Sequence, residues 1–484
     1  MSAFEAVIGI ECHVELCTRS KMFCGCANAF GGQPNERVCP VCLALPGALP
    51  VANREAIALL IRAGMAFGCT VPEHSKFDRK NYFYPDMPKN YQISQYDMPL
   101  LVGGAVDYWL EDGTMKSCRL TRIHLEEDTG KSTHAGSGDG RIAGSAYSLV
   151  DFNRAGVPLM ECVSEPDLRS ATEAVAYLEA LKRTYQQLGV SDVKMEEGSL
   201  RCDANVSLRP RGSETLGTKT EIKNMNSFRS VYRAIESEIA RQTQTLEAGG
   251  RIIQETRGWD EFQGVTHSMR SKEEAHDYRY FPDPDLVPLD FSKAPGAKLA
   301  GALPELPSAR FVRYHQRLGI EPKSATQLTE NQRLAEFFDR AVERSNNAQQ
   351  SLNFVLGDLS RLANETGVAV ADSQVTPAAL GELIDLLSSR TINSKIAKEL
   401  LPRMWSGEGS PKAIVERDGL AQTSDAGLVE GFVDNVIASQ SKAVADYRQG
   451  KTNILGFLTG QVMKESRGKA DPALVQELLK RKLS

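Results

Sequence analysis

Two carboxylates and an imidazole alternate with apolar residues near the start of the chain. If residues 7–16 form a β-strand, Glu11, His13 and Glu15 fall on one face and mostly apolar side chains fall on the other. Side chains two positions apart on one face lie roughly 6.6 to 7 Å from each other. Such a row fits a hard divalent cation such as Mg²⁺, held by carboxylates and an imidazole together. The alternative is an edge strand whose polar face only meets water.

Four cysteines form two close pairs that could hold a second kind of metal. Cys24 and Cys26 are followed, after twelve residues, by Cys39 and Cys42. This spacing matches a tetrahedral Cys₄ zinc site of structural type, although the first pair is C-x-C rather than the commoner C-x-x-C. The alternative is a set of unrelated thiols. All ten cysteines lie at or before Cys202 in a chain without an export signal, which favours metal ligation or scattered buried thiols over disulfides.

Later segments with strand-like alternation supply further charged side chains. A strand over 118–128 places Glu126 and Glu127 on opposite faces. Glu161 lies among apolar neighbours, where a lone carboxylate is costly, so it must pair with a basic group or bind a cation. Residues 201–209 alternate cleanly and put Asp203 on a polar face with two arginines. Several polar-faced strands favour a lined cavity over a solvated surface, provided that the strands are neighbours.

The segment 76–95 interleaves basic residues with tyrosine and phenylalanine, and its two prolines exclude a long helix. Such a loop is rich in groups that bind phosphate and stack on bases. A tyrosine-rich loop that packs on its own sheet is an equally good interpretation. The run Gly130-Lys131-Ser132 resembles the end of a phosphate loop, but Leu125 stands where the first glycine is needed, so no P-loop is present.

The elements that must position these residues change in character along the chain. The first part is rich in predicted strands, with helices over 54–67, from Ser170 and from about Ser227 to Gly249. From about residue 303 the pattern is helical, and a glycine- and serine-rich break at 405–411 precedes a last small helical unit. With 484 residues the chain is long for one core, and its composition is that of an ordinary globular protein. We therefore predict an α+β protein of about three domains.

The charge is unevenly distributed. The whole chain carries a net charge of −5, whereas residues 441–484 hold nine basic and four acidic side chains, a net of +5, which leaves −10 for the remainder. A basic tail on an acidic body suggests contact with a polyanion at one end, and a solvated basic helix face is the alternative. No apolar run approaches the roughly 18 to 20 residues of a membrane span, and the N-terminus lacks a targeting pattern, so we expect a cytoplasmic protein.

Several long motifs lie along this sequence, at residues 7–16, 76–86, 124–131, 193–205, 223–228, 277–285 and 456–464, and they include Val-Ile-Gly-Ile-Glu-Cys-His-Val-Glu-Leu and His-Leu-Glu-Glu-Asp-Thr-Gly-Lys. Together they resemble one known family over essentially the full chain, the B subunits of the aspartyl/glutamyl-tRNA(Asn/Gln) amidotransferases. The resemblance implies a β-rich, cradle-shaped domain over 1–292 that includes the cysteine loop, a helical domain over 293–408, and an all-α tail over 409–484 that holds the elbow of a tRNA.

The resemblance also implies roles for individual residues. The positions that match the Mg²⁺ ligands of the family are Glu11, His13, Glu126 and Glu161, and positions beside the family's ammonia tunnel are Glu127, Lys80, Tyr82 and Lys89. The phosphoryl transfer that this family carries out would also suit Asp203 as a ligand of a second ion and Arg79 or Lys80 as a phosphate contact. A Cys₄ zinc occurs in only some members of the family, so Cys24, Cys26, Cys39 and Cys42 mark a subset.

The implied reaction is the ATP-dependent transamidation of mischarged Glu-tRNA(Gln), Asp-tRNA(Asn) or both, which makes the protein a carbon–nitrogen ligase. The chain lacks the glycine- and serine-rich nucleophile motif of an amidase, so ammonia would come from a partner that carries the amidase, and a small third polypeptide would complete a heterotrimer. Two other hypotheses come from different classes. One is a non-enzymatic tRNA-binding scaffold with solvated acidic strands, and the other is a metal-dependent hydrolase that acts alone.

Overall fold

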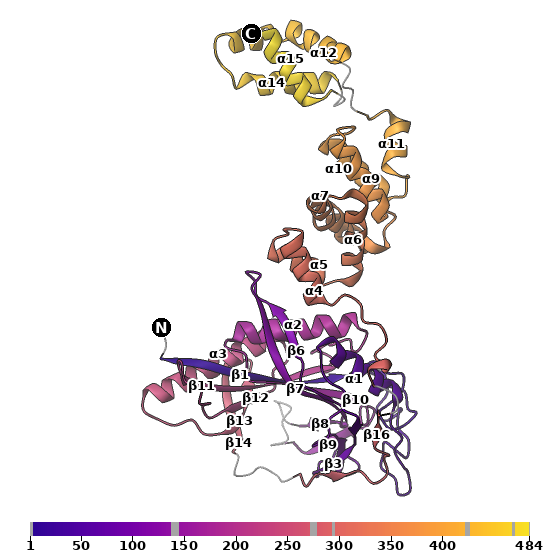
Figure 1. The fold of residues 1–484 in the computed structure, drawn as a ribbon, viewed down its shortest axis with the longest axis vertical. Helices are drawn as coiled ribbons and strands as arrows, with labels where there is room; N and C mark the ends of the chain where they lie inside the picture. Colours follow the sequence, from indigo (N-terminus) through magenta and orange to yellow (C-terminus); the bar gives the residue numbers. More distant parts are fainter. Residues whose placement is uncertain are drawn as a thin grey trace. The chain divides into compact units, whose positions relative to one another are not determined.

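The computed structural model describes residues 3–136, 145–271, 278–292, 296–421, 426–466 and 470–483. Contacts within the chain define two compact units, residues 1–315 and residues 316–484. The first is built on β-sheets with helices packed against them, and every regular element described in the second is helical (Figure 1). The predicted α+β class is therefore confirmed. The domain boundaries at 292/293 and 408/409 remain predictions.

A nine-stranded sheet forms the centre of the first unit. Its strand order is β14-β13-β12-β11-β1-β10-β7-β5, with β6 also paired to β7, and all neighbours are antiparallel except β12 and β13. The strands are β1 (Phe4–Glu15), β5 (Leu101–Val102), β6 (Ala105–Trp109), β7 (Met115–Glu127), β10 (Pro158–Ser164), β11 (Leu200–Pro210), β12 (Thr220–Lys223), β13 (Glu255–Asp260) and β14 (Val265–Ser271). Strand β1 lies in the middle, so its polar face has neighbours on both sides.

The alternation in β1 sorts its side chains as the sequence predicts. Ile8, Ile10 and Val14 are buried in the main hydrophobic core, whereas Glu11 and His13 on the other face remain partly exposed. Three helices contribute to the same core, α1 (Arg54–Ala66), α2 (Ala171–Gln187) and α3 (Phe228–Glu247). The helices therefore cover the apolar side of the sheet and leave its polar side for other contacts (Figure 1).

Each of these helices begins at a side-chain cap that the sequence predicts or allows. The Asn53 side chain accepts hydrogen bonds from the first turn of α1, and Ser170 and Ser227 do so for α2 and α3. Helix α1 ends before Gly68, which has a positive φ of 69°, as expected for a glycine that terminates a helix.

Smaller sheets lie beside the central one. Strand β15 (Phe281–Pro282) pairs with β3 (Asp78–Asn81), which pairs with β4 (Tyr91–Ser94), and β4 contacts β7. The other two pairs are β2 (His74–Ser75) with β16 (Leu289–Asp290) and β8 (Lys131–Ala135) with β9 (Tyr147–Asp151). The loop that carries the cysteines is held by the buried Lys21, whose ammonium donates to the carbonyls of Arg37 (2.9 Å) and Phe152 (3.2 Å).

The second unit contains two groups of helices. The first group comprises α5 (Pro322–Thr329), α6 (Gln332–Ser345), α7 (Ala348–Asn353), α8 (Ser360–Thr366), α9 (Pro377–Ser388), α10 (Ser394–Trp405) and α11 (Pro411–Asp418). The second group, α12 (Ala426–Ser439), α13 (Ser441–Arg448), α14 (Ile454–Glu465) and α15 (Pro472–Leu483), has a hydrophobic cluster of its own around Val433, Leu458 and Leu479. Helix α4 (Pro307–Val312) belongs to the first unit, where Phe311 stacks on Trp109.

Among the described residues, no helix combines the length and apolarity of a membrane span.

Candidate active site

The register of the central sheet brings the predicted acids together. In β1, His13 lies opposite Glu161 of β10, and Glu11 lies opposite Asp203 of β11. Glu161 in turn lies opposite His124 of β7. Residues separated by about 200 positions in the chain thus share one polar face, an outcome that depends on the order of the strands as well as on their alternation.

His13 lies at the centre of this group. Its Nε2 atom is 3.5 Å from Glu161 Oε2, 3.7 Å from Glu126 Oε1 and 3.8 Å from Glu11 Oε1. Candidate ligand atoms of His13, Glu126 and Glu161 all lie within 4.8 Å of one another, and those of Glu11, His13 and Asp203 form a second such set. Ligands around an octahedral ion at about 2.1 Å are separated by roughly 3 to 4.2 Å, so both sets need only small side-chain shifts to hold Mg²⁺.

The electrostatics of the cluster favour a positive charge among its acids. The Glu161 side chain is only 9% exposed and lies 3.4 Å from His124 Nε2 and 3.7 Å from Arg122 Nη2. Burial raises the pKa of Glu161, but His124 and His13 outweigh this effect and hold the pKa well below its usual value. Burial lowers the pKa of His13, but Glu161, Glu126 and Glu11 raise it to about 9. The surrounding acids thus favour a positive charge at this position, which a bound metal ion would also supply.

Glu126 and Glu127 point in opposite directions, as the alternation predicts. Glu126 faces His13 and accepts a hydrogen bond from Ser94 Oγ at 3.4 Å. The carboxylate of Glu127 accepts from the backbone N–H of Ile93 at 3.0 Å and forms an ion pair with Lys89. The two adjacent acids therefore belong to different sites.

A cavity of about 370 Å³ lies beside these candidate metal ligands. Its walls include His13, Glu126 and Asp203 together with three cationic side chains, Lys80 of β3, Arg201 of β11 and Lys223 of β12. The Lys80 ammonium also lies 5.0 Å from the centre of the Tyr278 ring. Acids that suit a divalent cation and bases that suit phosphate thus line one space.

Other residues predicted for the site lie further from this cavity. Arg79 is paired with Asp283, with Nε 2.7 Å from Oδ2, and with Asp285, and its guanidinium lies 4.2 Å from the centre of the Tyr91 ring. Arg79 is not among the described residues that line the cavity, whereas its neighbour Lys80 is. The hydroxyl of Tyr82 donates to Gln92 Oε1 at 3.2 Å, and Gln92 lines the cavity.

The four cysteines of the predicted zinc loop converge, and their sulfur atoms lie within 4.8 Å of one another. The sulfurs of Cys39 and Cys42 are 3.8 Å apart, which is close to the edge of a tetrahedron with Zn–S bonds of about 2.3 Å. A hydrogen bond from the Cys24 thiol lowers the pKa of Cys42 to about 5, although burial opposes this. The donor set and its spacing fit a structural zinc ion.

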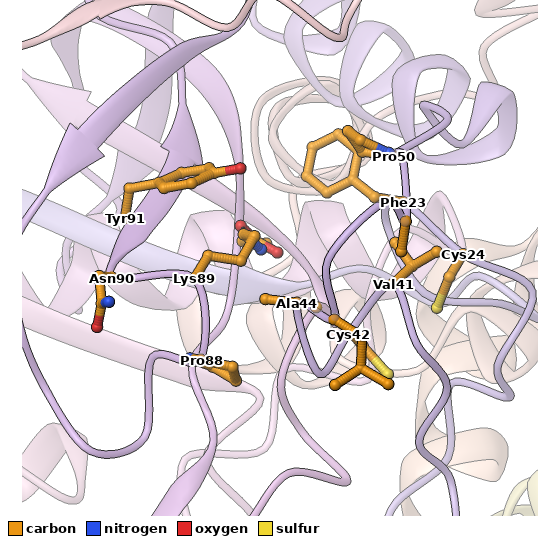
Figure 2. A pocket seen from close by; sticks show the side chains of 14 residues that line it. Phe23, Cys24, Val41, Cys42, Ala44, Pro50, Pro88, Lys89, Asn90 and Tyr91 are labelled. Carbon is orange, nitrogen blue, oxygen red and sulfur yellow. The ribbon is translucent and has the colours of Figure 1, made fainter.

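A second cavity, of about 290 Å³, lies between the cysteine loop and the Lys89–Glu127 pair. Figure 2 shows Cys24 and Cys42 on one side of it and Lys89 with Tyr91 on the other. Its lining combines apolar side chains, such as Phe23, Val41 and Pro50, with polar ones, such as Lys89 and Glu127.

Some residues of the site were not identified from the sequence. His124 and Arg122 contact Glu161, and Asp128 accepts a hydrogen bond from Arg201 Nη2 at 2.5 Å. Lys223 forms an ion pair with Asp203. The alternation in 201–209 and 219–223 places Arg201 and Lys223 on polar faces, so that signal was present, but only the strand order shows that these faces border the acids.

The fold and this site define a chain of two compact units, in which acids suited to a metal ion lie beside a cavity with cationic side chains. Residues 6–295 match a family model described as the GatB/GatE catalytic domain, and residues 336–483 match one described as the GatB domain. The chain belongs to the family of aspartyl/glutamyl-tRNA(Asn/Gln) amidotransferase B subunits, as the motifs indicated.

The similarity to relatives with that name covers nearly the whole of each chain. The chain is 52% identical over 484 residues to the protein of Carboxydothermus hydrogenoformans, covering 100% of both. It is 52% identical to that of Moorella thermoacetica over 480 residues, covering 99% of this chain and 100% of the relative. It is 47% identical to that of Acaryochloris marina over 488 residues, covering 99% and 98%.

Proposed function

We propose that this chain phosphorylates the side-chain carboxylate of a glutamate or aspartate that is esterified to a tRNA, and then passes the activated group to ammonia. The observation that carries the proposal is the group formed by Glu11, His13, Glu126 and Glu161 at the edge of a cavity with three cationic side chains. The relatives at about 50% identity are named as subunits of an amidotransferase for such tRNAs, which supports the same reaction here.

The chemistry explains why the site needs both acids and bases. A carboxylate does not react with ammonia, because oxide is too poor a leaving group. A carboxylate oxygen therefore attacks the γ-phosphorus of ATP, the bond to ADP breaks, and an acyl phosphate forms. Ammonia then attacks the acyl carbon, inorganic phosphate leaves, and the amide remains on the tRNA. Phosphoryl transfer requires placement and neutralisation of charge more than covalent help from the protein.

The residues divide this work between them. Glu11, His13, Glu126 and Glu161 would hold Mg²⁺, with Asp203 available to a second ion, and the bound metal would neutralise phosphate oxygens. Lys80, which lines the same cavity, would bind the transferred phosphate, and its neighbour Arg79 supports the local structure through Asp283.

A route for ammonia follows from the second cavity. Ammonia from the amidase partner would enter between the cysteine loop and Lys89, pass the Lys89–Glu127 pair, and reach the site beside Tyr82 and Gln92. Gln92 supports this path because it donates to the backbone carbonyl of Glu127 at 2.7 Å and also lines the cavity with the acids. A zinc ion in the cysteine loop would fix one wall of the route, and a small third polypeptide would complete the heterotrimer.

Replacement of Glu11 by alanine in the assembled enzyme tests the proposal. Purified enzyme is supplied with mischarged tRNA, Mg²⁺ and labelled ATP, and ADP release is measured with tRNA binding. Glu11→Ala should abolish ADP release that depends on the charged tRNA and leave tRNA affinity nearly unchanged. Glu5→Ala is the matched control, because Glu5 lies on the same strand and pairs with Arg209 outside the cluster. Unchanged turnover in Glu11→Ala would remove Glu11 from the site, and tRNA binding without any turnover would favour the scaffold hypothesis.

A further inference from the structure

Asp203 has two kinds of neighbour that compete for its negative charge. On one side, its carboxylate belongs to the candidate ligand set with Glu11 and His13. On the other side, it forms an ion pair with the ammonium of Lys223, at the end of β12. A carboxylate in this position is already balanced by a cation of the protein itself.

Lys223 has a second carboxylate within reach. Its Nζ lies 3.2 Å from Glu221 Oε1, and Glu221 is held in place by the hydroxyl of Thr256, which donates to its other oxygen at 2.7 Å. The Lys223 side chain is 31% exposed and lines the same cavity as Lys80 and Arg201. The ammonium is therefore anchored near Glu221 even if its contact with Asp203 weakens, and it faces the space where a phosphate would lie.

We propose that Lys223 binds phosphate, and that its ion pair with Asp203 prevents this until a divalent cation binds beside Glu11, His13 and Asp203. The proposal rests on the proposed function, because it assigns a role within that site. With a cation bound, Asp203 would share its negative charge with the metal, and the ammonium of Lys223 would lose part of its attraction to Asp203. Lys223 then loses its main counter-charge and is free to bind the anionic phosphates of ATP. Metal binding thereby prepares the cavity for the nucleotide.

The lysine has opposite effects on the two ligands, and this distinguishes the proposal from a structural role. Lys223→Met keeps most of the length of the side chain and removes its charge. Without the competing ammonium, metal alone should bind more tightly, whereas ATP should bind more weakly. Loss of a purely structural ion pair would weaken the binding of both metal and ATP or would change the binding of neither.

The experiment titrates the full chain with Mn²⁺ alone, followed by the electron paramagnetic resonance signal of free Mn²⁺. A second titration uses a non-hydrolysable ATP analogue at saturating Mn²⁺. Lys223→Met should lower the Kd for Mn²⁺ by about tenfold, as expected when a unit charge is removed within a few ångströms of a divalent ion. It should raise the Kd for the analogue by about tenfold. Lys219→Met is the matched control, an exposed lysine just before the same strand, and should change neither.

The outcomes separate this inference from the proposed function. Mn²⁺ affinity that stays the same or falls in Lys223→Met, with normal binding to the unmodified chain, would overturn the role of Lys223 alone. Analogue binding that is unaffected by Lys223→Met would also overturn it. If the unmodified chain binds no Mn²⁺, both the inference and the proposed metal site fail.

Discussion

Glu161 brings a buried negative charge into the candidate site. A single, nearly buried carboxylate faces three basic groups, His13, His124 and Arg122. The sequence predicted that this acid must pair or bind a cation, because it lies among apolar residues. It did not reveal the partners, which come from strands β1 and β7 and depend on the register.

Glu161→Gln should therefore impair both metal binding and stability. The amide removes the nearly buried carboxylate that Arg122, His124 and His13 contact, so we expect the free energy of unfolding to fall by about 2–4 kcal/mol. Mn²⁺ affinity should fall at least tenfold, measured by titration at a temperature where the variant is folded. Glu165→Gln is the control, since Glu165 accepts from Thr121 at the surface, and should cost less than about 0.5 kcal/mol. Equal stability of the two variants would contradict the account of Glu161.

The cysteine loop allows a direct test by metal analysis. We expect the purified chain to hold one equivalent of zinc, and Cys39→Ser to hold much less and to melt at a lower temperature, because a ligand is lost. Cys17→Ser is the matched control, since Cys17 is exposed and lies outside the cluster. Zinc content that is the same in Cys39→Ser as in the unmodified chain would show that the four thiols are not ligands.

At the scale of elements, alternation and caps were readable from the sequence, but the pairing of strands was not. The polar and apolar faces of β1 and β11 and the start of α2 at Ser170 follow from local patterns. The spacing of Ser170 and Glu173 allows a capping box, but only half of it forms, since Glu173 accepts from the backbone N–H of Arg169 at 3.0 Å and from Lys116 Nζ at 2.7 Å. The Glu173 carboxylate pairs with Lys116, which is distant in the sequence, and no local pattern could show this contact.

The turn after β10 is fixed by Asp167, which gives a prediction with a defined pH dependence. Both oxygens of Asp167 accept from Arg119 of β7 at 2.8 Å, and this pairing lowers the pKa of Asp167. A lowered folded-state pKa gives stability that is complete above the unfolded value and is lost as pH falls through the folded value. Asp167→Asn should thus cost about 1 kcal/mol at pH 7 in denaturant unfolding, and the difference should shrink below about pH 4. A difference that grows on acidification would contradict this sign.

At the scale of the whole molecule, positive charge gathers in the last part of the chain, residues 441–484. Residues 441–484 have a net charge of +5, and helices α12 to α15 have their own hydrophobic cluster. The sequence predicted these helices well because their apolar periodicity is local. It could not show what the basic side chains contact, since that depends on a partner molecule.

Truncation after residue 421 should weaken tRNA binding and flatten its dependence on salt, because fewer counterions are released from the tRNA. The cut keeps α11, which contacts α9, and removes α12 to α15 with their own core. Binding is measured at several salt concentrations with the assembled enzyme. Mn²⁺ binding by the truncated form should be unchanged and serves as the control. A salt slope equal to that of the full chain would rule out the tail as a tRNA contact.

The central claim is that acids from three strands hold a divalent cation where the tRNA-bound carboxylate is activated. The most direct measurement is anomalous diffraction from crystals soaked with Mn²⁺. The account predicts a peak within bonding distance of His13 Nε2 and of carboxylate oxygens from Glu11, Glu126 and Glu161, at about 2.0–2.3 Å. Strong ion peaks elsewhere, with these four side chains unliganded at saturating Mn²⁺, would contradict it.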